Sequence, residues 1–106
     1  MKHQLWADLM VPGIDVGHGF SNEASDLINV RKAFPTTPVG RFVEKNRISY
    51  WFNRAGNVGG GTWFSPAGLP HNFIRNVNYS TRICFNVTDE EEVLLRLGLA
   101  GMLTFT

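Results

Sequence analysis

Cysteine occurs only once in the 106 residues, at Cys84. A single thiol cannot form an internal disulfide or supply the cysteine ligands of a zinc cluster, so the sequence excludes disulfide-stabilised scaffolds and zinc fingers. A chain without structural disulfides suits a reducing compartment, and we therefore predict a cytoplasmic protein.

Long apolar runs are missing as well. The longest uncharged stretch, 55–74, contains five glycines and two prolines, and the apolar tail 97–106 is only about half as long as a membrane span requires. The first 19 residues carry Asp8 and Pro12 and lack the basic start and clean apolar core of a signal peptide. From these absences we predict that the protein is not exported and has no membrane partner.

No charge of one sign dominates the chain, whose formal net charge is +1. The charges are nevertheless segregated: residues 1–30 sum to −3, residues 31–82 to +7 and residues 83–106 to −3. Aromatic side chains are interleaved with the cations of the middle segment, a composition typical of surfaces that attract phosphates and stack bases. The candidate anion-binding residues are Arg41, Lys45, Arg47, Arg54 and Arg75.

Two helices are indicated by local signals. Ser21 is a suitable N-cap for a helix over 21–34, where apolar residues recur at three-to-four spacing until Pro35. Thr88 followed by Glu91 forms a capping-box pattern, which predicts a helix over 89–98. Acidic residues in its first turn complement the positive end of the helix dipole.

The region between these helices favours strands and turns. We expect a strand over 41–53, because it is rich in β-branched and aromatic residues. The remaining predictions are a loop over 35–40, a glycine turn at 55–61, a short strand over 62–65, a tight loop at 66–70 and two strands within 73–87 joined near 76–80. One α+β, β-rich domain covering 1–106 is therefore expected.

A short motif precedes the last predicted strands. Gly60, Pro66, Gly68 and His71 stand in the register of the second conserved motif of the cupins, with Arg75 where that motif has asparagine. The segment 47–88 also resembles the related 2-oxoglutarate-dependent oxygenases, in which a strand after the iron-binding histidine supplies a basic residue to the co-substrate. The resemblance implies a small jelly-roll or curled antiparallel sheet of cupin type, flanked by the two helices.

The resemblance also implies a site. His71 would be the candidate ligand for iron or zinc, and Arg82 would bind a ligand carboxylate at a pocket mouth shared with Tyr50 and Trp63. The paired His-x-Asp or His-x-Glu ligands of such oxygenases are missing, since His3 is followed two places on by Leu5 and His18 by Phe20. We therefore predict a small-ligand or partner-binding module without a complete catalytic metal site.

Several alternatives stay open. The basic, aromatic-rich middle, 31–82, favours a protein that binds nucleic acid or another polyanion. A reduced iron and 2-oxoglutarate oxygenase is a second alternative. For single residues, His71 can be a loop histidine bonded to backbone, and Arg82 can pair with a Glu from 90–92. Exposed edge strands would also allow a homo-oligomer.

Overall fold

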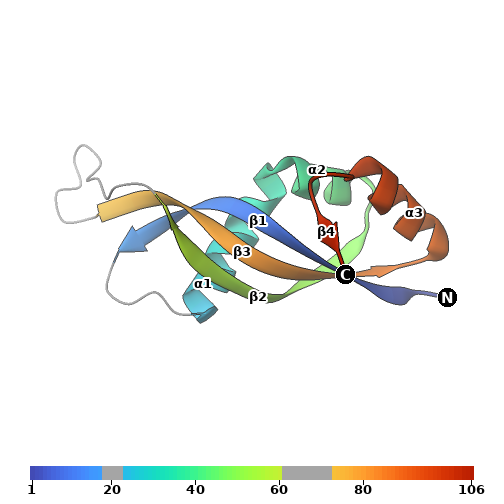
Figure 1. The fold of residues 1–106 in the computed structure, drawn as a ribbon, viewed down its shortest axis with the longest axis horizontal. Helices are drawn as coiled ribbons and strands as arrows, with labels where there is room; N and C mark the ends of the chain where they lie inside the picture. Colours follow the sequence, from blue (N-terminus) through green and yellow to red (C-terminus); the bar gives the residue numbers. More distant parts are fainter. Residues whose placement is uncertain (18–22, 61–72) are drawn as a thin grey trace.

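The computed structural model describes residues 1–17, 23–60 and 73–106, and in these ranges three α-helices accompany one four-stranded antiparallel sheet (Figure 1). The α+β class is therefore confirmed. In chain order the elements are β1 (His3–Gly17), α1 (Glu23–Ala33), the 3-10 helix η1 (Phe34–Thr36), α2 (Pro38–Lys45), β2 (Ser49–Gly60), β3 (Phe73–Val87), α3 (Asp89–Gly98) and β4 (Thr104–Phe105).

The sheet has the strand order β2-β3-β1-β4. Strand β3 pairs with β1 along its full length, from Phe73 opposite Gly17 to Val87 opposite His3. Strand β2 pairs with the other side of β3 and contains two register shifts, whereas β4 adds only a two-residue ladder to β1. The two longest strands therefore form the centre of the sheet over most of its length.

One face of the sheet forms the core with the helices. From Leu5 to Val11 in β1 and from Val77 to Val87 in β3 the odd-numbered side chains are buried, including Ile83 and Phe85. They join residues of all three α-helices in a single apolar cluster. Because side chains alternate across a strand, the even-numbered residues of β1 and β3 lie on the opposite side, together with Trp51 and Arg54 of β2. We call this side the outer face.

Both predicted helices are present, and α3 begins as its sequence indicates. The Thr88 hydroxyl accepts a hydrogen bond from the Glu91 amide at 3.2 Å, and the Glu91 carboxylate accepts one from the Thr88 amide at 2.9 Å. The capping box therefore satisfies two amides that have no partner inside the helix. Helix α1 spans 23–33 in place of the expected 21–34.

A third helix, α2, includes residues of the expected loop over 35–40 and the first residues of the strand expected over 41–53. Both predictions are wrong in this region. Thr37 caps it by accepting a bond from the Gly40 amide at 3.0 Å, and Pro38 occupies the first turn, where a missing amide hydrogen costs nothing. Its buried side chains, Val39 and Val43, lie one helical turn apart. The strand itself starts only at Ser49.

The turn predictions within the sheet are also wrong. Strand β2 continues through the residues 55–60 that were expected to form a glycine turn, and β3 is one strand without a break at 76–80. Strand β1 was not predicted at all. The short strand 62–65 and the loop 66–70 lie outside the described residues. No helix in the described ranges is long and apolar enough to cross a membrane.

Candidate nucleic-acid interface

Two tryptophans lie side by side on the outer face of the sheet. Trp51 on β2, Cys84 on β3 and Trp6 on β1 are aligned across the three strands. The two indole rings meet edge to face, with centroids 5.3 Å apart and an angle of 78° between their planes. Trp51 remains 44% exposed, while Cys84 between them is fully buried. Burial raises the pKa of the Cys84 thiol, which favours its protonated form.

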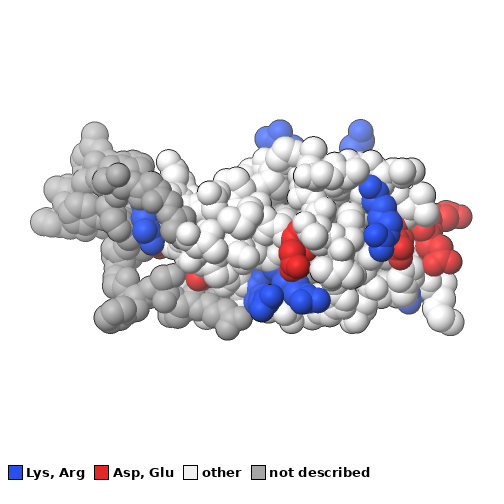
Figure 2. Space-filling model, in the orientation of Figure 1, with Lys and Arg blue, Asp and Glu red and all other residues white. Residues whose placement is uncertain are grey.

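Charged side chains occupy the neighbouring row. Arg54, Arg82 and Asp8 are aligned across β2, β3 and β1, because the irregularity between Phe52 and Arg54 places Arg54 on the outer face. The Arg82 guanidinium lies 5.2 Å from the centroid of the Trp6 ring, a cation–π distance. Figure 2 shows basic side chains gathered beside an acidic one over the middle of the sheet.

Polar side chains continue along the outer face of β3. Asn76, Asn78 and Ser80 are exposed at alternate positions before Arg82, and Asn86 is exposed beyond it. None of the three asparagines makes a side-chain hydrogen bond to another described residue. The central strand therefore presents a line of hydrogen-bonding groups that leads away from the tryptophan pair.

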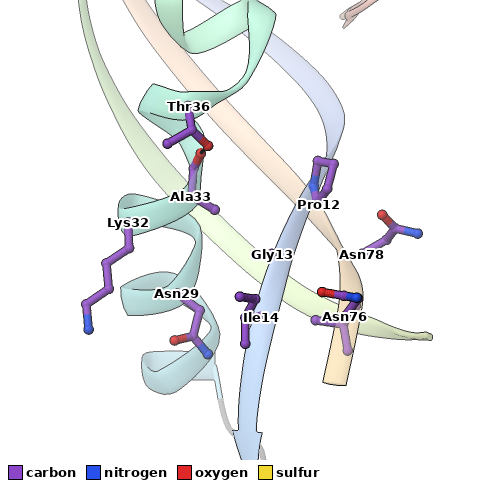
Figure 3. Close-up of a pocket in the computed structure, with 10 residues that line it drawn as sticks. Pro12, Gly13, Ile14, Asn29, Lys32, Ala33, Thr36, Asn76 and Asn78 are labelled. Carbon is purple, nitrogen blue, oxygen red and sulfur yellow. Dashed lines mark hydrogen bonds between the residues drawn. The ribbon is translucent and has the colours of Figure 1, made fainter. Parts of the chain in front are cut away.

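A cavity of about 750 Å³ lies where this line reaches the edge of β1 (Figure 3). Helix α1 forms one wall, to which it contributes Asn29 and Lys32, and Asn76 and Asn78 of β3 line the opposite side. The lining also includes apolar residues of β1, β3 and α1, namely Pro12, Ile14, Ala33 and Val77, together with Gly13 and Thr36.

Tyr79 connects two elements of the cavity wall, α1 and β1, through its hydroxyl group. Its hydroxyl accepts a hydrogen bond from Asn29 at 3.1 Å and donates one to the Ile14 carbonyl at 3.5 Å. Burial raises the pKa of this phenol, so it remains a neutral donor and acceptor. A Cβ atom at Gly13 would stand only 2.8 Å from the Tyr79 ring, so the glycine allows the ring to pass under β1.

A buried polar cluster ties the same end of the sheet to α1. Asp15 of β1 accepts bonds from Arg75 at 3.3 and 3.4 Å and from the Asn57 side chain at 3.2 Å. The backbone amide of Asn57 donates a hydrogen bond to the Asp26 carboxylate of α1 at 3.2 Å. Each carboxylate is thus partnered, and the cluster joins β1, β2, β3 and α1.

The residues expected around a shared pocket mouth do not all lie together. Tyr50 is on the side of the sheet that faces the helices. The centroid of its ring lies 5.0 Å from that of Phe34, and its hydroxyl donates a hydrogen bond to the Glu44 carboxylate at 3.2 Å. Burial and the Glu44 carboxylate raise the pKa of Tyr50. Arg82 lies on the outer face, so the sheet separates it from Tyr50. His71 and Trp63 lie outside the described residues.

The five candidate anion-binding residues are also distributed over different surfaces. Arg54 is on the outer face, whereas Arg41 and Lys45 are exposed on α2, on the other side of the sheet. Arg47 is in the turn after α2 with a φ of 54°, and Arg75 is engaged by Asp15. The predicted basic middle therefore does not form one continuous face among these residues.

Trp6 is a residue of the candidate interface that was not predicted from the sequence. Part of a signal was present: Leu5, Ala7, Leu9 and Val11 are apolar at every second position and the charged Asp8 lies between two of them, which is the period of a half-buried strand. That alternation would have placed Trp6 on the side of β1 that faces away from the core.

Neither a metal site among the described residues nor a known relative assigns a function. Within 1–17, 23–60 and 73–106, no three His, Cys, Asp or Glu side chains come together so that they could hold a metal ion. No protein-family model, curated protein or solved structure matches the chain. The functional proposal therefore depends on the geometry of the outer face.

Proposed function

We propose that the outer face binds single-stranded nucleic acid, the class of partner expected for the basic and aromatic middle segment. The observation that carries the proposal is the tryptophan pair of the outer face, in which Trp51 is exposed and the Arg82 guanidinium lies over the Trp6 ring. Stacking on an aromatic side chain is tolerant of base identity and contributes about 1–3 kcal/mol per base. Trp51, which is 44% exposed, supplies such a ring on an accessible sheet surface.

Electrostatics on the neighbouring row favour an anion. Arg54 and Arg82 stand directly opposite each other across two strands, and like charges in that position destabilise a sheet. Asp8, on the far side of Arg82, is a single negative charge against two positive ones. Phosphates of a strand that crosses this row relieve the repulsion, because each of the two guanidinium groups donates charge-assisted hydrogen bonds to a phosphate.

Geometry favours unpaired bases over a duplex. In a double helix the bases are already stacked on one another, and their faces are not accessible to a flat surface. A single strand can unstack a base onto Trp51 while its backbone crosses the arginine row in the adjoining register. The separation of Arg41 and Lys45 from this face limits the number of phosphates that it neutralises.

The direct test is fluorescence anisotropy with a labelled single strand of about twelve nucleotides, as DNA and as RNA. Trp51→Ala should weaken binding roughly 5- to 150-fold, which corresponds to the loss of one stacked base. Arg82→Gln should weaken it as well. Arg41→Gln is the matched control, because it removes an exposed arginine on the opposite side of the sheet.

Salt dependence checks the electrostatic part of the proposal. With Arg54 and Arg82 as the phosphate contacts, the slope of log affinity against log salt should be about −1.4, at −0.7 for each phosphate. Arg54→Gln should reduce its magnitude by about half. Salt-independent binding, or equal losses in Arg41→Gln and Arg82→Gln, would contradict the assignment of this face.

A second copy of the chain is the competing occupant of the same face. Light scattering at increasing protein concentration distinguishes the two, because a sheet-to-sheet dimer buries Trp51 and would dissociate in Trp51→Ala. A wild-type dimer that becomes monomeric in this variant, without nucleic-acid binding, would refute the proposal. Unquenched tryptophan fluorescence on addition of a saturating strand would refute it too.

The cupin-type scaffold with a small ligand, and the reduced oxygenase, stay predictions. Their defining residue, His71, lies outside the described residues, and so do Pro66 and Gly68. Both depend on iron or zinc at His71 or on a carboxylate at Arg82. Thermal stabilisation by added iron and 2-oxoglutarate, abolished in His71→Ala, would favour them over the nucleic-acid proposal.

A further inference from the structure

We infer that the cavity beside α1 holds the terminal nucleotide of the strand that crosses the outer face; this inference rests on the function proposed above. The connection between the two surfaces is made by Asn76 and Asn78. Both belong to the outward row of β3 that contains Arg82, and both line the cavity. A strand that passes Arg82 and follows β3 over Ser80 therefore arrives at the cavity.

The distance suits a short oligonucleotide. Six residues separate Arg82 from Asn76 on β3, which is about 20 Å at 3.3 Å per residue. Bases at the spacing of about 3.4 Å found in B-DNA would cover this length with about six nucleotides, and a more extended backbone would need fewer. A strand shorter than this span can occupy the tryptophan pair or the cavity but not both.

Hydrogen-bonding groups of the cavity match the edges of a base. A carboxamide offers both donors and acceptors, and so does each base edge. Asn76 and Asn78 make no side-chain hydrogen bond to other described residues, so their amides are available to a ligand. Asn29 is oriented by its bond to Tyr79, which leaves its Oδ1 as an acceptor on the cavity wall.

Shape and charge also fit a nucleotide. The volume of about 750 Å³ lies within the usual range of small-ligand sites. Pro12, Ile14 and Ala33 provide an apolar surface for the flat rings of a base, and Lys32 from α1 supplies a cation for the terminal phosphate. Figure 3 shows that the Lys32 side chain extends from α1 on the side away from β1 and from the asparagines.

The test compares strands of about eight and about three nucleotides, because only the longer one spans the distance between the tryptophans and the cavity. The double variant Asn76→Ala/Asn78→Ala changes two exposed side chains that the fold does not use. It should weaken binding of the longer strand about tenfold and leave the Trp51-dependent binding of the shorter strand unchanged. A 5′- or 3′-phosphate should strengthen binding of the longer strand, and Lys32→Gln should abolish that gain.

Ser49→Ala is the matched control, since it removes an exposed polar side chain of the sheet at the end far from the cavity. Wild-type binding that depends on Trp51 and Arg82 but is unaffected by the double asparagine variant would overturn the inference and leave the proposed function intact. Failure of the wild-type protein to bind any oligonucleotide would overturn the proposed function, and with it the inference. Thermal unfolding of each variant verifies that it is folded.

Discussion

Replacement of Asn57 by alanine tests the polar cluster that anchors the cavity end of the sheet. The side chain donates one hydrogen bond to the Asp15 carboxylate at 3.2 Å, whereas the contact with Asp26 is made by the backbone amide and survives the substitution. Asn57→Ala therefore removes this bond to the carboxylate of Asp15, a residue that is 8% exposed.

The magnitude follows from what remains around Asp15. A hydrogen bond to a charged group contributes about 1.5–3 kcal/mol. Because Arg75 still donates to the same oxygen, the carboxylate is not left without a partner, and the expected loss is near the lower limit, about 1.5 kcal/mol. For a domain of this size that loss lowers the melting temperature by roughly 6–12 °C.

Differential scanning calorimetry measures this shift, with Asn53→Ala as the matched control. Asn53 is an exposed asparagine of the same strand, at the register shift, and its replacement should change stability by less than about 0.5 kcal/mol. Asn57→Asp should be more harmful than Asn57→Ala, because it adds a third carboxylate near Asp15 and Asp26. Equal melting temperatures for Asn57→Ala and Asn53→Ala would refute the assigned role of the cluster.

Three further predictions concern the scaffold. Thr88→Ala should lower the free energy of unfolding in urea by about 0.5–2 kcal/mol, and Thr88→Ser should restore it, because a hydroxyl caps α3. Gly40→Ala should cost about 3 kcal/mol or more in the same assay, since a Cβ there collides with the backbone of the preceding 3-10 turn; Gly56→Ala, with open space around it, should not. The hydrogen bond with His3 makes the largest contribution to lowering the pKa of Glu92, and the hydrogen bond from Arg96 lowers it further. The destabilisation caused by Glu92→Gln should therefore be full above the ordinary carboxyl pKa and disappear as pH falls through the lowered one; a pH-independent difference in melting temperature would contradict this.

Local sequence signals were sufficient for the helix α3 and failed for α2. The capping box at Thr88 acts within one turn of the chain, so its pattern predicts the helix start directly. Thr37 and Pro38 form an equally local signal for α2, but the β-branched and aromatic residues that follow favoured a strand. Burial of Val39 and Val43 in the common core outweighs that propensity.

Polar residues within β3 led to the incorrect prediction of a turn near 76–80. Asn76, Asn78 and Ser80 have the composition of a turn, yet each occupies an outward position between the buried residues Val77 and Tyr79. Their place in a strand is determined by pairing with β1, a segment more than sixty residues away. Pairing partners at that separation leave no local signal.

The outer face was likewise beyond local reasoning. Arg54 was identified from composition alone, together with four cations that the fold places elsewhere. The partner of Trp51, Trp6, belongs to the undetected strand β1 and is brought to it by the register of both strands with β3. Cross-strand neighbours of this kind are defined by register, and a shift by one residue would move them to the opposite face.

From its residues alone this chain is committed to a disulfide-free α+β domain, a capped helix after Thr88 and the inward alternation of 81–87, because helix capping and side-chain alternation act over a few neighbouring residues. Which side chains meet on the outer face and around the cavity was decided only by the tertiary structure. Strand order and register join segments that are distant in the sequence, and burial of one common core selects among the possible pairings.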